Sequence, residues 1–160
     1  MVLAYVPDRT LPQLIQIRNA LEAQLGLIKA TGTIVFDATP ANVPTADDTL
    51  IISDGVTATT YTWKAAAAAA NEVTIGATAT LSGVNLLAAI QANSPATTDN
   101  EGNTLADPAR GITATMASLT ISLTNTVHGT LGNVAITDST DNVTVTGMSG
   151  GADGVQADPI

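Results

Sequence analysis

Few residues in this chain of 160 could carry out acid–base or nucleophilic chemistry. His128, in the stretch VHGT, is the only histidine, and a Ser–His–Asp arrangement needs a histidine placed as the base beside its nucleophile. The sequence around His128 is a glycine-containing loop without a nucleophile elbow, which favours a turn or surface histidine. A metal site built from several histidines is excluded because there is one. We therefore expect no enzyme activity and no catalytic residue.

Acidic side chains near the middle of the chain could instead bind a metal ion. Asp99, Glu101 and Asn103 alternate as the first ligands of a calcium loop do. An EF-hand loop also needs glycine at its sixth position and glutamate at its twelfth. Here Gly102 takes the fourth position and Arg110 the twelfth. The pattern favours a polar loop, with a calcium site as the open alternative, and we expect no cofactor. Asp99, Glu101 and Arg110 become candidate partner contacts.

The charge balance restricts the classes of partner. The chain has 5 Lys+Arg against 14 Asp+Glu, a formal net charge of -9 and a pI near 4.1. A surface this acidic repels nucleic acid and anionic membranes. The absence of cysteine excludes disulfides and thiolate metal sites. Because no apolar run approaches the ~20 residues of a membrane span, and the first residues lack a basic region, we expect neither a membrane segment nor a secretory signal.

Residues 1–30 are predicted to form an arm followed by a helix. Thr10 suits the N-cap, Pro12 fits the first turn, and Gly26 suits the C-cap. Apolar residues at helical spacing, continuing to Ile28, predict a wide apolar face. Two interpretations stay open: the helix packs on its own domain, or arm and helix dock on a neighbouring subunit. For docking, the candidate contacts are Val2, Leu3, Tyr5, Val6, Leu14, Ile17 and Leu21.

From residue 31 onwards, alternating Thr, Val, Ile and Ala predict short strands. A hairpin is expected from 49–55 and 57–64, a second helix over 78–94, and a final hairpin of 134–140 with 142–148. Further strands are predicted at 31–38, 71–76, 112–118 and 119–125. Without a βαβ series, this order predicts an α+β fold. We expect a mostly antiparallel β-sandwich-like module with one packed helix, preceded by the N-terminal arm and helix.

Six consecutive alanines, residues 65–70, interrupt this series between two predicted strands. A run of six is too short to hold a helix alone, since isolated helices need ~12–15 residues. We interpret it as the wide connection of a hairpin, with one helical turn as the alternative. Neither gives the run a functional group. The polar segment 96–111 is predicted as a mobile or partner-contacting loop.

The order of these elements resembles a β-rich module of tailed-bacteriophage virion proteins, found in tail sheath-like, tail and other structural proteins. The likeness covers about residues 31–154 and leaves residues 1–30 outside. It is carried by the stretches TLIISDGVTATTYTWK, NLLAAI, ITATMASLTISLTNTVHGTLGNVAIT and VTVTGMSGGADG. The resemblance implies no enzyme activity and no cofactor, and makes the alanine run a variable connection. Because the module is reused, the resemblance does not fix a position in the virion.

We therefore expect a virion structural protein that acts by assembly, in three parts: an arm and docking helix (1–30), the β-rich module (31–150) and an exposed tail (151–160). The expected partners are the chain itself, as a homo-oligomer, and other virion proteins such as the major capsid protein or tail proteins. Its expected location is the virion, assembled in the bacterial host cytoplasm. A protein that decorates or cements the capsid is favoured, and a tail tube or other tail component comes second. A receptor- or glycan-binding module comes third, because one Trp, two Tyr and one Phe leave little material for a sugar platform.

Overall fold

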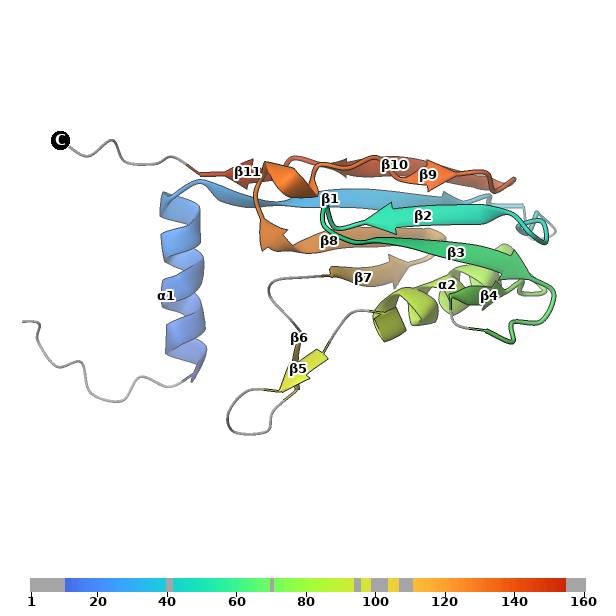
Figure 1. Ribbon diagram of the computed structural model, residues 1–160, viewed down its shortest axis with the longest axis horizontal. Helices are drawn as coiled ribbons and strands as arrows, with labels where there is room; N and C mark the ends of the chain where they lie inside the picture. Colours follow the sequence, from blue (N-terminus) through green and yellow to red (C-terminus); the bar gives the residue numbers. More distant parts are fainter. Residues whose placement is uncertain are drawn as a thin grey trace, which may run out of the picture.

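The computed structural model describes residues 11–39, 42–69, 71–93, 96–98, 104–106 and 111–154. Among these residues, a five-stranded and a four-stranded sheet face each other, and a two-stranded hairpin stands apart (Figure 1). This is the predicted α+β, mostly antiparallel, sandwich-like fold. The elements in chain order are α1 (Leu11–Gln24), β1 (Leu27–Phe36), β2 (Thr49–Ser53), β3 (Ala58–Lys64), β4 (Glu72–Thr74), α2 (Ala79–Asn93), β5 (Ala96–Thr98), β6 (Thr104–Ala106), β7 (Ile112–Ala117), β8 (Thr120–His128), the 3-10 turn η1 (Thr130–Gly132), β9 (Thr137–Asp138), β10 (Val143–Ser149) and β11 (Ala152–Asp153).

The five-stranded sheet is built around the long strand β1. Its order is β10–β1–β8–β7, β11 pairs with the first residues of β1, and every pair is antiparallel. Burial along β1 alternates, so that Ala30, Ile34 and Phe36 point into the core. The strand begins at Leu27, earlier than predicted, because the positive φ of Gly26 ends the helix there. Ile28, which we expected to extend the helical face, therefore lies in a strand.

The four-stranded sheet has the order β4–β3–β2–β9. Its β2–β3 hairpin is as predicted, with Ser53 opposite Ala58. The predicted hairpin around the alanine run is wrong, because β4 pairs with β3 in parallel. The run instead loops back beside the strand it leaves. The Glu72 carboxylate accepts hydrogen bonds from the N–H groups of Ala68 and Ala69, which curls the loop onto the start of β4 and lowers the pKa of Glu72.

The predicted final hairpin is also wrong, because its two strands belong to different sheets. β9 pairs with β2 in the four-stranded sheet, whereas β10 pairs with β1 in the five-stranded sheet. The residues between them cross from one sheet to the other. This crossing is fixed by Trp63, whose Nε1 donates a hydrogen bond of 3.2 Å to Thr140 Oγ1. Alternation predicted two strands here correctly, but alternation carries no information about the partner of a strand.

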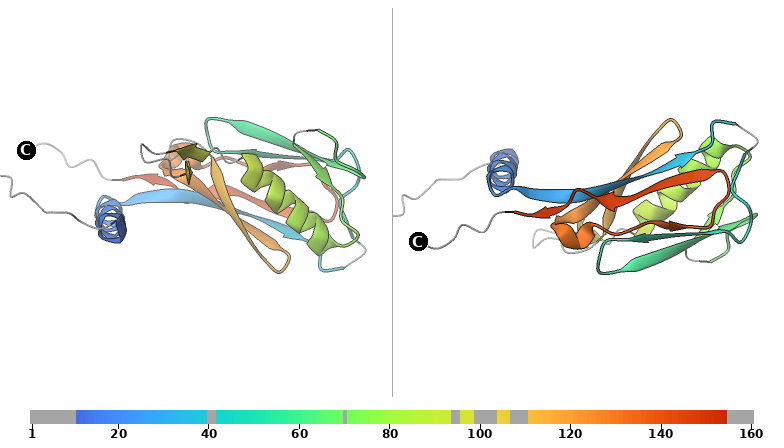
Figure 2. Two further views of the ribbon diagram at one scale, coloured as in Figure 1. Left: turned by 90° about the horizontal axis from the view of Figure 1, so that it is seen from below. Right: turned by 90° about the horizontal axis from the view of Figure 1, so that it is seen from above.

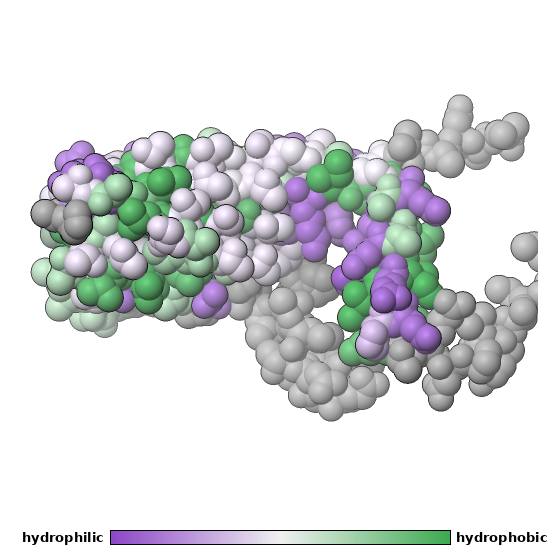
Figure 3. Space-filling view, turned by 180° about the vertical axis from the view of Figure 1, so that it is seen from behind, coloured by the Kyte–Doolittle hydropathy of each residue, from purple (hydrophilic) through white to green (hydrophobic). Residues whose placement is uncertain are grey.

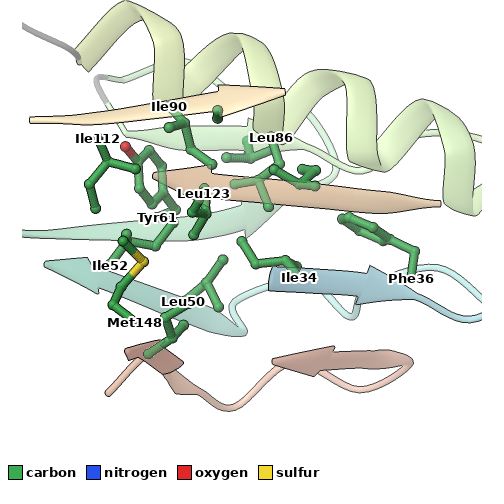
Figure 4. Close-up of a cluster of buried hydrophobic side chains, with 14 of the residues drawn as sticks. Ile34, Phe36, Leu50, Ile52, Tyr61, Leu86, Ile90, Ile112, Leu123 and Met148 are labelled. Atoms are coloured by element: carbon green, nitrogen blue, oxygen red, sulfur yellow. The ribbon is translucent and has the colours of Figure 1, made fainter. Parts of the chain in front are cut away.

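The core lies between the two sheets and is completed by α2 along one edge (Figure 2). Figure 4 shows Leu86 and Ile90 of α2 pointing toward side chains from both sheets. Phe36 and Trp63 meet edge to face, with ring centroids 6.1 Å apart. The remaining buried apolar side chains are mainly aliphatic, as the low aromatic content requires. They include Ile34, Leu50, Ile52, Tyr61, Val73, Ile121, Leu123 and Met148.

Helix α1 stands at one end of the sandwich, across the direction of the strands, where it contacts the start of β1 (Figure 1).

The predicted division of the chain into 1–30, 31–150 and 151–160 stays a prediction. Strand β1 crosses the first predicted boundary, because it begins at Leu27 and continues past residue 30. Strand β11 lies in the expected tail and pairs with Leu27 and Ile28. The described residues of the tail, 151–154, are therefore attached to the five-stranded sheet.

Candidate assembly interface

Helix α1 is covered little by the rest of the described chain. None of its residues is buried. Leu11, Leu14, Leu21 and the adjoining Leu25 keep 71%, 50%, 51% and 47% of their surfaces exposed. Their positions place them on one side of the helix, which a hydrogen bond from Leu25 N to Leu21 O extends by one residue. We call these four residues the α1 stripe. Exposed leucines gathered on one side of a helix make the stripe a candidate surface for contact with a partner.

The C-terminal end of α1 is tied to the sandwich through the side chain of Glu22. Glu22 Oε2 lies 3.3 Å from Nε2 of His128, at the end of β8. Glu22 Oε1 lies 3.5 Å from Nε of Arg18, one helical turn earlier. Partly exposed pairs of this kind contribute little to stability. The tie therefore orients α1 while leaving the α1 stripe uncovered.

The structure describes only some of the residues predicted to contact partners. Leu14 and Leu21 are exposed within the α1 stripe, and Ile17 is half-buried on the same helix. These three therefore share one element, as predicted. The other seven lie outside the described residues: Val2, Leu3, Tyr5, Val6, Asp99, Glu101 and Arg110.

The segment 96–111, predicted as a loop, carries a short hairpin. β5 and β6 pair antiparallel over three residues each, with Ala96 opposite Ala106. In Figure 1 this hairpin lies away from the two large sheets, on the same side as the free end of α1. The possible calcium ligands of this segment lie outside the described residues. Its position still makes the hairpin a second candidate for contact with a partner.

The end of that segment is anchored by Asp54. The N–H of Gly111 donates a hydrogen bond of 2.8 Å to Asp54 Oδ2, while Asp54 Oδ1 accepts from the N–H groups of Val56 and Thr57. Burial raises the pKa of Asp54, but the three N–H groups outweigh burial and hold the pKa below its usual value. The ionised carboxylate thus fixes the β2–β3 turn and the point where β7 begins.

Helix α2 presents a second exposed apolar surface, which sequence reasoning missed. Its inner side is buried, but Leu81 and Val84 on its outer side remain 50% and 47% exposed. Thr80 and Ala88 are exposed beside them, and we call these four residues the α2 face. Helix 78–94 was predicted only as a packed helix, because the helical spacing of its apolar residues indicates one side against a core and does not reveal a second apolar side. The available signal was the lack of any charged residue between 73 and 98, which leaves the outer side of the helix without a charged residue.

The outer surface of the central part of the five-stranded sheet is rich in hydroxyl groups, and the charged residues Lys29 and Asp153 lie at the start of β1 and in β11. Neighbouring strands place Thr33 opposite Thr146 on one side and Ser122 on the other, and Thr115 stands opposite Ser122. Figure 3 views the molecule from behind and shows the middle of the sandwich mostly pale or green, with hydrophilic residues near α1 and at the opposite end. For a chain of net charge -9, this is a large surface without electrostatic repulsion.

The described residues offer little for catalysis or metal binding. They contain no group of three or more His, Asp or Glu that could hold a metal ion. A shallow depression of about 540 Å³ beside β1 and β10 has Asp37 as its charged lining residue. That carboxylate is already occupied, since it accepts hydrogen bonds from Thr39 N and Asn42 Nδ2 that lower the pKa of Asp37. His128, the candidate base of the sequence, is engaged with Glu22.

Comparison of the chain with family models, curated proteins and solved structures finds no match in any of the three. Among the described residues, neither helix has the length and hydropathy needed to cross a membrane. The geometry of the surface therefore carries the functional argument. It offers two exposed apolar helix surfaces and a threonine-rich sheet surface, all of which suit contact between proteins.

Proposed function

We propose that this chain is a structural protein of a tailed-bacteriophage virion, acting by assembly as a capsid decoration or cement protein. The α1 stripe is the observation that carries the proposal. A helix without a buried residue gains little from its own sandwich, and helices of this length are marginal in isolation. A partner that covered the stripe would remove exposed leucine surface from water at roughly 25 cal/mol per Å2.

The charge distribution supports assembly with copies of itself or with other virion proteins. Two chains of net charge -9 repel one another across most surfaces. The α1 stripe and the threonine-rich sheet are largely free of acid, so contacts there avoid that repulsion. Many copies on one particle would add their weak contacts through avidity.

The size of the assembly in solution tests the structural part of this proposal. We expect light scattering after size exclusion to give an oligomer for the full chain and a monomer for the double variant Leu14→Gln, Leu21→Gln. Leu131→Gln is the matched control, because Leu131 is 63% exposed on η1, outside the α1 stripe. Identical masses for all three proteins would show that the α1 stripe is not an interface.

Immunogold electron microscopy tests the location. An antibody against the chain should label the heads of phage particles released from bacteria that carry the gene. Label at tails would instead favour the second candidate, a tail protein, for which the β5–β6 hairpin is the supporting observation. A tail tube subunit usually contributes a long hairpin to its neighbour, and strands of three residues are short for that role. Particles without label would contradict both locations.

The glycan-binding alternative has less support. Sugar sites usually present aromatic platforms, but Phe36, Tyr61 and Trp63 are all buried in the core. The remaining aromatic residue, Tyr5, lies outside the described residues. A glycan array on which the oligomer binds a defined sugar would revive this alternative.

A further inference from the structure

We propose that the α1 stripe of one copy packs on the α2 face of the next copy, so that the chain assembles head to tail. This inference rests on the proposed function, because it names the partner of the α1 stripe within the same assembly. Each copy carries one of each surface. A single type of contact, repeated from copy to copy, would cover both exposed apolar helix surfaces.

The two surfaces cannot meet within one molecule. In Figure 1, α1 stands beyond one end of the strands, and α2 lies along the edge of the sandwich toward the other end. Both views of Figure 2 show the same separation. α1 is also held in place at His128 through Glu22, at its own end of the sandwich. A contact between the α1 stripe and an α2 face therefore joins two molecules.

Charge favours a second copy as the occupant of the α2 face. This helix and its flanks, residues 73–98, carry no charge, so an acidic chain can approach without repulsion. The α1 stripe runs past one charged position, Arg18, whose guanidinium is paired with Glu22. The aliphatic stem of Arg18 can lie along apolar surface while its head stays with Glu22. Both surfaces are thus neutral when they meet.

The side chains of the two surfaces also fit, over part of the stripe. At about 1.5 Å per residue, the α2 face (residues 80–88) spans roughly 12 Å and the α1 stripe (residues 11–25) roughly 21 Å, so one α2 face covers about half of the stripe. The α1 stripe offers large leucine side chains. The α2 face offers a row at spacings of three and four residues, Leu81, Val84 and Ala88, in which small side chains leave grooves. Ridges on one helix can therefore enter grooves on the other.

The alternative is a symmetric dimer in which two α1 stripes pair with each other. That arrangement uses one surface twice and leaves the α2 face exposed on both copies. A head-to-tail contact is heterologous and continues until it closes into a ring or extends as a filament. The two arrangements therefore differ in which variants dissociate them.

Complementation between variants distinguishes the arrangements. The α1 variant is Leu14→Gln with Leu21→Gln, the α2 variant is Leu81→Gln with Val84→Gln, and Leu131→Gln is the control. We expect light scattering to show a monomer for the α1 and α2 variants separately, and a dimer that grows no further when the two are mixed. The mixed dimer forms because each partner supplies the surface that the other lacks. Thermal unfolding of the α2 variant checks that the exposed substitutions leave the fold intact.

The results separate this inference from the proposed function. If the α2 variant assembles like the unchanged chain while the α1 variant is monomeric, the head-to-tail contact is wrong and the assembly role of α1 stands. If both variants assemble like the unchanged chain, the inference and the α1-based proposal fail together. Two monomeric variants that form no dimer on mixing would overturn the inference as well.

Cross-linking provides a measurement that does not depend on disrupting the interface. The chain has no cysteine, so Leu21→Cys and Val84→Cys each introduce a single thiol. We expect mild oxidation of an equal mixture to give mainly a disulfide-linked dimer that contains one chain of each variant. A product containing only two Leu21→Cys chains would show that α1 pairs with α1 and would overturn the inference.

Discussion

Nδ2 of Asn125 donates a hydrogen bond of 2.7 Å to the main-chain carbonyl of Asp54, and this bond joins the two sheets at the end of the sandwich nearer α1. Asn125 belongs to β8 and Asp54 to the β2–β3 turn. Asn125 is 1% exposed, and its Oδ1 accepts a hydrogen bond from Val127 N. One amide thus satisfies two main-chain groups on different elements.

Substituting Asn125 should therefore destabilise the fold. Asn125→Ala leaves the Asp54 carbonyl and the Val127 N–H without these partners, which should lower the free energy of unfolding by about 2 kcal/mol. Ser122→Ala, on the exposed side of the same strand, should change it by about 0.5 kcal/mol or less. Urea unfolding of both variants measures the difference. Equal midpoints for the two would show that the amide does not hold the sheets together.

Asp54 should make stability depend on pH in the acid range. Its pKa is lowered in the folded state, so the ionised carboxylate stabilises the fold above the unfolded value of 3.8. That contribution is lost as the pH falls through the lower folded value. In Asp54→Asn, the amide has no charge to lose and also presents N–H groups toward Gly111 N–H. At pH 6 the variant should have a lower free energy of unfolding than the unchanged chain, and this difference between the two proteins should narrow below about pH 4. If urea unfolding gives the same difference in free energy of unfolding at pH 6 and below pH 4, the stabilising role of the ionised Asp54 carboxylate is wrong.

Local periodicity was enough to predict most strands and both helices. Alternation predicted β2, β3, β7 and β8, and the Ser-Asp-Gly turn gave the β2–β3 hairpin; the pairing of β7 with β8 was not part of the prediction. For β4 the partner β3 was predicted but the parallel direction was not, because alternation does not tell parallel from antiparallel pairing. The partner of β9 was not predictable, because it lies far away in the chain. Ser139 bonding to Thr49 is an example, at a separation of 90 residues.

Only part of the candidate interface was predictable from the sequence. The helical spacing of Leu14 and Leu21 indicated an apolar surface, but spacing cannot say whether the same domain covers it. The α2 face was missed because Leu81 and Val84 have the same side-chain type as the buried Leu86 beside them. Only the packing of α2 against the two sheets separates its inner side from its outer side.

The crossing between the sheets should depend on Thr140. Its Oγ1 accepts the hydrogen bond from Nε1 of Trp63, which is 1% exposed. Thr140→Val keeps the shape of the side chain but leaves the indole N–H unpaired, which should lower the free energy of unfolding by about 1 to 2 kcal/mol. Thr144→Val, at an exposed position of β10, is the matched control and should change the free energy of unfolding by about 0.5 kcal/mol or less. Fluorescence of Trp63, the only tryptophan, follows the unfolding of both variants. Equal stabilities would mean that this hydrogen bond does not fix the crossing.

Hydrogen exchange should reveal whether a partner covers α1. In a dissociated chain, the amides of α1 should exchange quickly, because the helix has no buried residue and is attached mainly at Glu22. Amides of β8 should exchange slowly in the same sample, since that strand is paired on both sides within the sheet. Assembly should slow exchange in α1 and leave β8 unchanged. The Leu14→Gln, Leu21→Gln variant should keep fast exchange in α1 at every protein concentration. Slow exchange of α1 in that monomeric variant would show that the helix is stable without a partner, which would remove the physical reason for assigning it to an interface.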